Sequence, residues 1–166
     1  MIRVVVDDIA FVQADAIVRP ATATLESTTP SLRRLEQVGG QRFWDGLQVR
    51  EELAVGAAVV TSGGDLAAEF VIHTIIRSTT EPVSGHSVRR ALRSAYQRAA
   101  DWALARVAMP LAGLGAGNLP LEEAVTALWD VVREHAGAVY PTDLTIVVDT
   151  EEEKQVVESF APEGML

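Results

Sequence analysis

The chain has 166 residues, 48% hydrophobic and 22% charged, which suits one well-filled core and is short for two ordinary domains. No apolar run is long enough to span a membrane, and the first ten residues lack the pattern of an export signal. The formal net charge of −9 disfavours free nucleic acid and anionic membranes as partners, and the lack of cysteine excludes disulfides and thiolate chemistry. We expect one cytoplasmic domain over residues 1–166, with a frayed tail after about residue 160.

Strands are expected where short β-branched runs are bounded by turn signals, and helices where apolar residues recur at helical spacing. In chain order these are strands at 2–6 and 15–18, helices at 30–40 and 41–53, strands at 56–62 and 69–76, a helix at 84–106, a strand at 106–111, a helix at 120–135, a strand at 143–149 and a helix at 151–160. The alternation in the second half indicates an α/β domain whose sheet is mostly parallel and covered on both faces.

The predicted helices also carry signals about which side chains are buried. The first is expected to end at Gly39-Gly40, because glycine commonly terminates helices. Trp44, Trp102 and Trp129 fall on apolar helical faces and are expected in the core. The arginines of residues 89–106 are expected to form a solvated face paired with nearby acids.

The stretch AGLGAGNLP, residues 112–120, lies between a predicted strand and a predicted helix. Gly113, Gly115 and Gly117 can take positive φ angles and turn successive N–H groups toward one point, as phosphate-binding loops do. The same glycines would also permit a mere tight turn. No Gly-Lys-Ser/Thr ending is present, and Asn118 occupies the third glycine position of a dinucleotide fingerprint, so neither a P-loop nor a typical NAD-dependent dehydrogenase is expected.

Four segments in order resemble the macrodomain, the ADP-ribose-binding α/β/α module. Asp8-Ile9 resembles the early Asp-Ile pair of that family, and DAIVRPAT (15–22) resembles its strand "DAIVNAAN". VTSGGDLAAEFVIHT (60–74) resembles its two-strand hairpin, and MPLAGLGAGNLPLEEA (109–124) resembles its second phosphate loop and the following helix. The match runs from about residue 2 to residue 148. It implies a three-layer α/β/α fold with a mixed, mostly parallel sheet, and no cofactor.

The resemblance also implies a ligand and its binding residues. Asp8 would accept a hydrogen bond from the adenine amino group, with Ile9 beside the ring. The loop from Gly113 to Leu119 would wrap the diphosphate and the distal ribose. The full set implied for ligand binding is Asp8, Ile9, Ala21, Thr22, Ser27, Thr28, Gly113, Leu114, Gly115, Ala116, Gly117, Asn118 and Leu119. Considered without the resemblance, Asp8 equally fits a solvated turn acid.

Two departures from the family pattern bear on catalysis. Thr22 replaces the asparagine that in hydrolytic members orients the distal ribose and a water, and a hydroxyl lacks the reach of a carboxamide. LESTTPS, residues 25–31, replaces the first glycine-rich loop and brings Glu26 near the expected phosphate position. Arg19 stands at the first asparagine position and either supplies the lost anion contact or extends its guanidinium to solvent.

These departures favour binding of ADP-ribose or a related adenine nucleotide, or of an ADP-ribosylated protein, with little or no catalysis. Two alternatives stay open: an ADP-ribosyl hydrolase in which Thr22, Ser27 or Thr28 positions water, and a degenerate macrodomain that acts through protein contacts.

The three histidines suggest neither a metal site nor a catalytic base. His73 lies in the apolar run FVIHTII and is expected to be a hydrogen-bonded core residue. His86 and His135 lie near predicted helix ends, where a solvated or capping role suffices. Without cysteine and with separated histidines, no metal-ligand spacing is present.

Overall fold

The computed structural model describes residues 1–48, 51–115 and 118–166. These residues form one six-stranded sheet in the order β1-β6-β5-β2-β4-β3. The strands are β1 (Ile2–Val6), β2 (Ala16–Thr22), β3 (Ala58–Ser62), β4 (Phe70–Arg77), β5 (Arg106–Met109) and β6 (Asp143–Val148). Every neighbouring pair is parallel except β3 and β4, which are antiparallel. The predicted mixed, mostly parallel sheet is confirmed.

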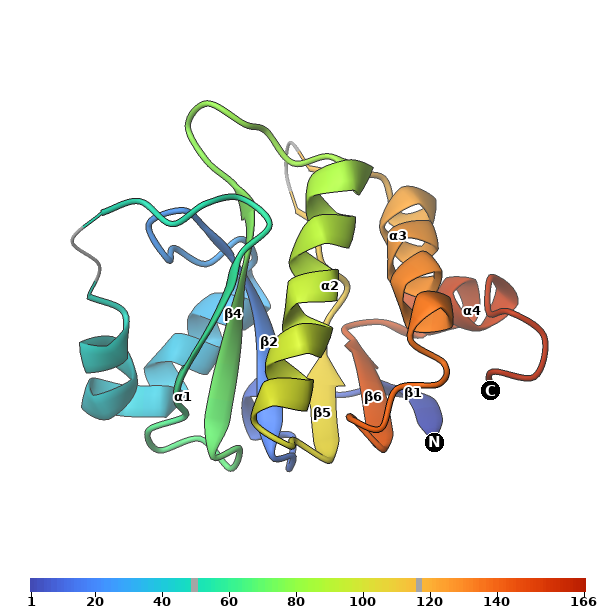
Figure 1. Ribbon diagram of the computed structural model, residues 1–166, viewed down its shortest axis with the longest axis horizontal. Coiled ribbons are helices and arrows are strands. Elements are labelled where there is room, and N and C mark those ends of the chain that lie inside the picture. Colours follow the sequence, from blue (N-terminus) through green and yellow to red (C-terminus); the bar gives the residue numbers. More distant parts are fainter. Residues whose placement is uncertain (49–50, 116–117) are drawn as a thin grey trace.

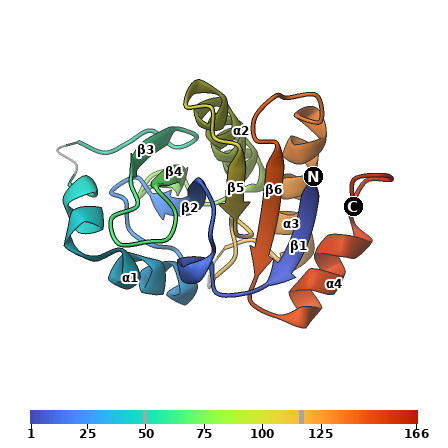
Figure 2. The ribbon, with the colours of Figure 1, turned by 90° about the horizontal axis from the view of Figure 1, so that it is seen from below.

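Helices cover both faces of this sheet (Figures 1 and 2). Helix α1 (Pro30–Gly46) and the short 3-10 helix η1 (Ile9–Phe11) lie on one face. Helices α2 (Gly85–Asp101) and α3 (Leu121–Glu134) lie on the other, and α4 (Glu151–Ser159) lies beside the edge strand β1. The result is the expected three-layer α/β/α arrangement.

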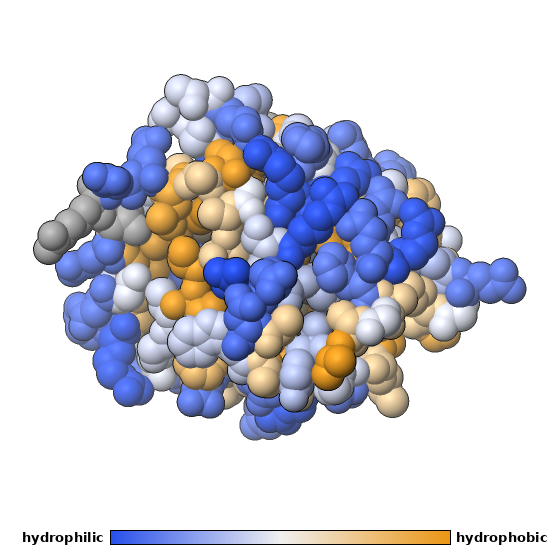
Figure 3. Space-filling view, viewed as in Figure 1, coloured by the Kyte–Doolittle hydropathy of each residue, from blue (hydrophilic) through white to orange (hydrophobic). Residues whose placement is uncertain are grey.

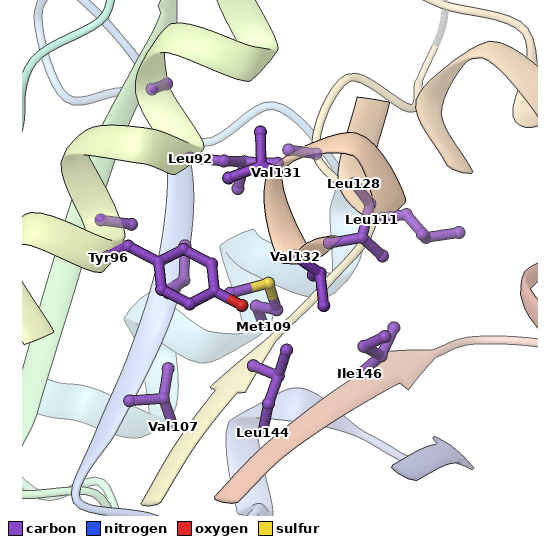
Figure 4. Packing of buried hydrophobic residues seen from close by; sticks show 14 of the residues in the cluster. Leu92, Tyr96, Val107, Met109, Leu111, Leu128, Val131, Val132, Leu144 and Ile146 are labelled. Carbon is purple, nitrogen blue, oxygen red and sulfur yellow. The ribbon is translucent and has the colours of Figure 1, made fainter. Parts of the chain in front are cut away.

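Alternate residues of each strand supply the two cores. Ile72 of β4 packs beneath α2, whereas its neighbour Val71 packs toward α1. The larger core lies between α2, α3 and the sheet, where Tyr96, Met109 and Leu128 interdigitate (Figure 4). The period of two along the strands therefore decides which side chains face which helical layer.

The helices on the α1 side differ from the sequence prediction in their extent. Gly40 has φ 71° and ψ −163°, so the first helix is interrupted at the predicted glycine pair, but the chain resumes helical geometry as far as Gly46. The predicted continuation to Leu53 is wrong. The Leu53 N–H instead donates to the Ala23 carbonyl (2.9 Å), which holds that segment against the loop after β2.

The long helix α2 also ends earlier than predicted. It begins after a Ser84–Ser87 capping box and ends at Asp101, not at Arg106. Ala103 adopts a left-handed conformation with φ 52°, which turns the chain and lets β5 begin at Arg106.

Two of the three tryptophans predicted to be core residues are exposed. Trp129 is 3% exposed and donates its indole N–H to the Val157 carbonyl (2.8 Å), as expected of a buried tryptophan. Trp102 is 51% exposed, because it follows the last residue of α2 and packs only edge-on against Phe70 (centroids 5.1 Å apart). Trp44 is 45% exposed, because the break at Gly40 gives Phe43, and not Trp44, the core-facing position.

The arginines of α2 are paired with acids, as predicted. Arg89 contacts Asp130 (2.7 Å) and Arg93 contacts Glu134 (2.8 Å), both across to α3. Hydrophilic side chains accordingly dominate the surface over α2 and α3 (Figure 3). These pairs are partly exposed and screened by solvent, so they contribute little to stability and this face is a solvated surface.

Candidate functional site

The loops that follow the parallel strands meet at one edge of the sheet, the upper edge in Figure 1. In α/β sheets ligands bind at this carboxyl edge, because several loops converge there on a rigid scaffold. The segments that follow β1, β2, β5 and β6 therefore define the candidate site.

The glycine loop follows β5 directly. Gly113 has φ 94° and Gly115 has φ 122°, so both take the positive φ angles that the sequence predicted. The Leu119 N–H donates to the Gly113 carbonyl (2.8 Å), and the Asn118 amide donates to the Leu114 carbonyl (3.1 Å). Ala116 and Gly117, predicted for the same role, lie outside the described residues.

The glycine loop lies directly against the segment that replaces the first glycine-rich loop. A Cβ on Gly115 would lie 3.0 Å from the Thr28 carbonyl oxygen and 2.9 Å from the Asn118 side-chain nitrogen. A Cβ on Gly113 would lie 3.0 Å from Leu119. The absence of a side chain at Gly115 is therefore what allows these two backbones to approach each other.

A small hollow lies between the glycine loop, η1 and the N-terminus of α1. Ile9, Leu114 and Ser31 line it together with Asp149, and its volume is about 40 Å³. The Ser31 hydroxyl donates to both carboxylate oxygens of Asp149 (3.1 and 3.0 Å). The first turn of α1 contains no acidic side chain. The partial positive charge at the N-terminus of this helix is therefore not neutralised by a carboxylate of its own first turn.

Asp149 was not assigned to the site by the sequence prediction, although the structure places it there. The sequence contains a signal for this position, because an aspartate between a parallel strand and the following helix lies at the carboxyl edge of the sheet.

Asp8 is the N-cap residue of η1, and both of its carboxylate oxygens have a partner. Its Oδ1 accepts from the Ala10 N–H (3.0 Å), and Arg34 Nε lies 2.8 Å from its Oδ2. The side chain is 27% exposed. Ile9, next to it, is almost fully buried and lines the small hollow. The aspartate is thus oriented by helix α1, while lone pairs on both oxygens remain.

Thr22, at the end of β2, closes the turn that follows it. Its hydroxyl accepts from the Glu26 N–H (3.1 Å) and lies 3.2 Å from the Thr24 hydroxyl. A second hollow of about 350 Å³ joins Thr22 to Asn118, with Arg77 beside them. Arg77 donates weakly to the Asn118 side-chain oxygen (3.5 Å).

Arg19 takes neither of the two positions considered from the sequence. Its guanidinium is fully buried on the α1 face of β2, pairs with Glu36 of α1, and donates to the Leu25 carbonyl (2.7 Å) and the Ser27 hydroxyl (3.1 Å). Burial lowers the pKa of Arg19, and the charge of Glu36 partly offsets this effect. Arg19 therefore reaches neither solvent nor the glycine loop. It holds the segment after β2 in place.

His73 lies beside Arg19 in register on β4 and completes this buried network. Because arginine only donates, the Arg19 Nη1 contact (3.1 Å) requires an unprotonated Nδ1, which leaves Nε2–H to donate to the Thr61 hydroxyl (2.6 Å). Burial, followed by the charge of Arg19, lowers the pKa of His73 to about 3. The predicted hydrogen-bonded core histidine is confirmed, and it is neutral.

This neutral histidine gives the stability of the protein a pH dependence. Unfolded chains protonate histidine near pH 6.5, whereas folded His73 stays neutral down to about pH 3. The unfolded state thus binds the extra proton in this window, so stability falls as the pH is lowered from 6.5, by about 2 kcal/mol at pH 5. Urea unfolding at pH 7 and pH 5 checks this. The His73→Gln variant should lose this part of the pH dependence, and an unchanged pH dependence would contradict the assignment.

The residues predicted for one site divide among three hollows. Ile9 and Leu114 line the small one, and Thr22 and Asn118 line the second. Ser27 lines a third, larger cavity on the α1 face, and its hydroxyl donates to Glu36. Ala21 is fully buried and bridges to Ser27 through the backbone. Thr28 contributes its carbonyl at Gly115, and Leu119 packs on Gly113.

Within the described ranges, no three or more His, Asp or Glu side chains form a group that could hold a metal ion. Nor does any helix in these ranges have the length and apolar character needed to cross a membrane.

Comparisons with known proteins relate this chain to one family. A sequence model of the Macro domain matches residues 20–128. An uncharacterised protein of Aeropyrum pernix is 30% identical over 178 residues, which cover 99% of this chain and 89% of the relative. A variant Oceanobacillus iheyensis macrodomain with ADPR gives a TM-score of 0.84 at 21% identity, covering 94% of this chain and 89% of the other. A Trypanosoma brucei macrodomain in complex with ADP-ribose gives a TM-score of 0.81 at 20% identity, and the match covers 95% of this chain and 68% of the other.

Proposed function

The chain belongs to the Macro domain family, and from this premise we propose that the cleft beside the Gly113–Leu119 loop binds ADP-ribose or a related adenine nucleotide. The observation that carries the proposal is the geometry of the glycine loop. Gly113 and Gly115 both have positive φ at the carboxyl edge of the sheet, next to the N-terminus of α1. Backbone N–H groups at such a position bind phosphate without any basic side chain, which suits an acidic protein.

Asp8 and the residues that line the small hollow support an adenosine end for the ligand. Asp8, oriented by Arg34 and the Ala10 N–H, keeps lone pairs for an exocyclic amino group. Ile9 and Leu114 offer apolar contact to a base, and Asp149 offers an acceptor for ribose hydroxyls. We assign the distal part of the ligand to the hollow beside Thr22, Arg77 and Asn118.

We infer that Gly115 and Thr28 separate when the ligand enters. The small hollow of about 40 Å³ holds little more than a water molecule, whereas small-molecule sites measure about 300–1,000 Å³. The contact to be opened is the approach of Gly115 to the Thr28 carbonyl. Affinity is reduced by the cost of this opening, in proportion to the population of the open state.

The side chains at the site favour binding over catalysis. The Thr22 hydroxyl is engaged by Glu26 and Thr24, and the Ser27 hydroxyl by Arg19 and Glu36. A group that orients water needs unused donors and acceptors within hydrogen-bond reach of the reacting atoms. No observation on the described residues favours the hydrolase alternative.

Calorimetric titration of the purified protein with ADP-ribose, ADP and AMP tests the proposal. We expect ADP-ribose to bind with a Kd of roughly 1–100 µM, ADP more weakly and AMP most weakly, because each shorter ligand loses contacts at the glycine loop. Asp8→Ala should weaken all three, since the adenine end is common to them. A folded sample that gives no heat with any of the three would overturn the proposal.

A further inference from the structure

A larger cavity lies on the α1 face, on the other side of residues 24–27 from the hollow beside Thr22. Its volume is about 610 Å³. The side chains that matter here are Ser27 and Glu26 from the segment after β2, and Arg33, Glu36, Trp44 and Asp45 from α1. Its described lining includes no residue of the glycine loop, and it shares only Thr24 and Glu26 with the hollow beside Thr22.

The wall of this cavity contains a carboxylate that is already oriented. The Glu36 side chain is 9% exposed, and its Oε1 receives both the Arg19 guanidinium and the Ser27 hydroxyl. Its Oε2 has no hydrogen-bond partner within the described part of the chain. It is also not one of the unpaired polar atoms there that are buried away from solvent. This oxygen is therefore the one that Glu36 presents to the cavity.

Trp44 supplies an aromatic surface to the same cavity. The interruption at Gly40 turns Phe43 into the core and leaves Trp44 45% exposed among polar neighbours. A tryptophan that lines a cavity together with carboxylates favours a cation there, because the ring quadrupole and the negative charges both attract positive charge. Asp45, held by Gln41 (2.8 Å), adds such a carboxylate beside it.

The charges of the lining decide the sign of the ligand. Glu36 is balanced by Arg19, which leaves Glu26 and Asp45 against Arg33. A guanidinium satisfies the site better than an ammonium, because it is planar, stacks on tryptophan and donates to carboxylates through a rigid fork. We propose that this cavity binds a guanidinium group, stacked on Trp44 and hydrogen-bonded to Glu36. An arginine-sized molecule suits its volume.

An NMR titration that follows the three tryptophan indole N–H signals tests the proposal with internal controls. The probes are L-arginine, N-acetyl-L-arginine amide and the neutral isostere L-citrulline. We expect arginine compounds to shift the Trp44 signal, and not those of exposed Trp102 or buried Trp129, with no response to citrulline. A response to the amide identifies an arginine side chain of a polypeptide as a competent ligand; a response to free arginine alone identifies the amino acid.

Variants locate the binding. Trp44→Leu should weaken arginine binding about tenfold by calorimetry, whereas Trp102→Leu, at a tryptophan of similar exposure, should leave it unchanged. The arginine titrations contain no ADP-ribose, so their outcome is independent of the fate of the ADP-ribose proposal. The inference is overturned if no Trp44 shift occurs, if citrulline matches arginine, or if Trp44→Leu binds like the parent protein.

Discussion

Replacing Glu36 by leucine is expected to lower the free energy of unfolding by about 3–5 kcal/mol, because it leaves the Arg19 guanidinium buried without a counter-charge. Arg19 is fully buried, and its remaining contacts are neutral groups: the Leu25 carbonyl, the Ser27 hydroxyl and His73. Arginine cannot relieve this cost by releasing its proton. For a chain of this size, the melting temperature should fall by about 10 °C or more.

The double variant Arg19→Met with Glu36→Leu provides the informative comparison. Removing both charges leaves apolar groups of similar size beside Phe43, so most of the lost stability should return. Arg93→Met serves as the matched control, because its pair with Glu134 is about 40% exposed and its loss should leave the stability almost unchanged. Urea unfolding measures all three. If Glu36→Leu were as stable as the parent protein, the buried pair would not have the role assigned to it.

Substituting Gly115 by glutamate is expected to weaken ADP-ribose binding by at least about 100-fold. The new Cβ would lie 3.0 Å from the Thr28 carbonyl oxygen, and φ at this position is 122°, which side chains rarely adopt. The added carboxylate would also repel a diphosphate beside the loop. Backbone strain, steric overlap and charge therefore act in the same direction.

Two other glycines, away from the glycine loop, provide controls for the added charge and for a positive φ. Gly164→Glu adds the same charge at another positive φ, 80°, but nothing lies within 4 Å of its Cβ position. Gly137→Glu adds the charge where no neighbour lies within 4 Å and φ is ordinary. Both should bind ADP-ribose like the parent protein. A folded Gly115→Glu protein with undiminished affinity would place the ligand away from the glycine loop.

The sequence by itself determined the element types, the family and the position of the glycine loop. The element types and the loop depend on neighbours within one helical turn or one strand, where hydrophobic period and glycine positions suffice. The family was indicated by the resemblance of four segments in order. Strands at 2–6, 143–149 and 69–76 were predicted to within a residue or two, as were α3 and α4. The positive φ angles of Gly113 and Gly115 follow from the same local signal.

Only the tertiary structure decided what the polar residues do. Arg19 is buried because Glu36, 17 residues away on another element, and His73, 54 residues away, meet it between the sheet and α1. Trp44 is exposed because the non-helical backbone at Gly40 redirects the rest of α1. The energy of a buried charge depends on its partners in space, and no period along the chain records them.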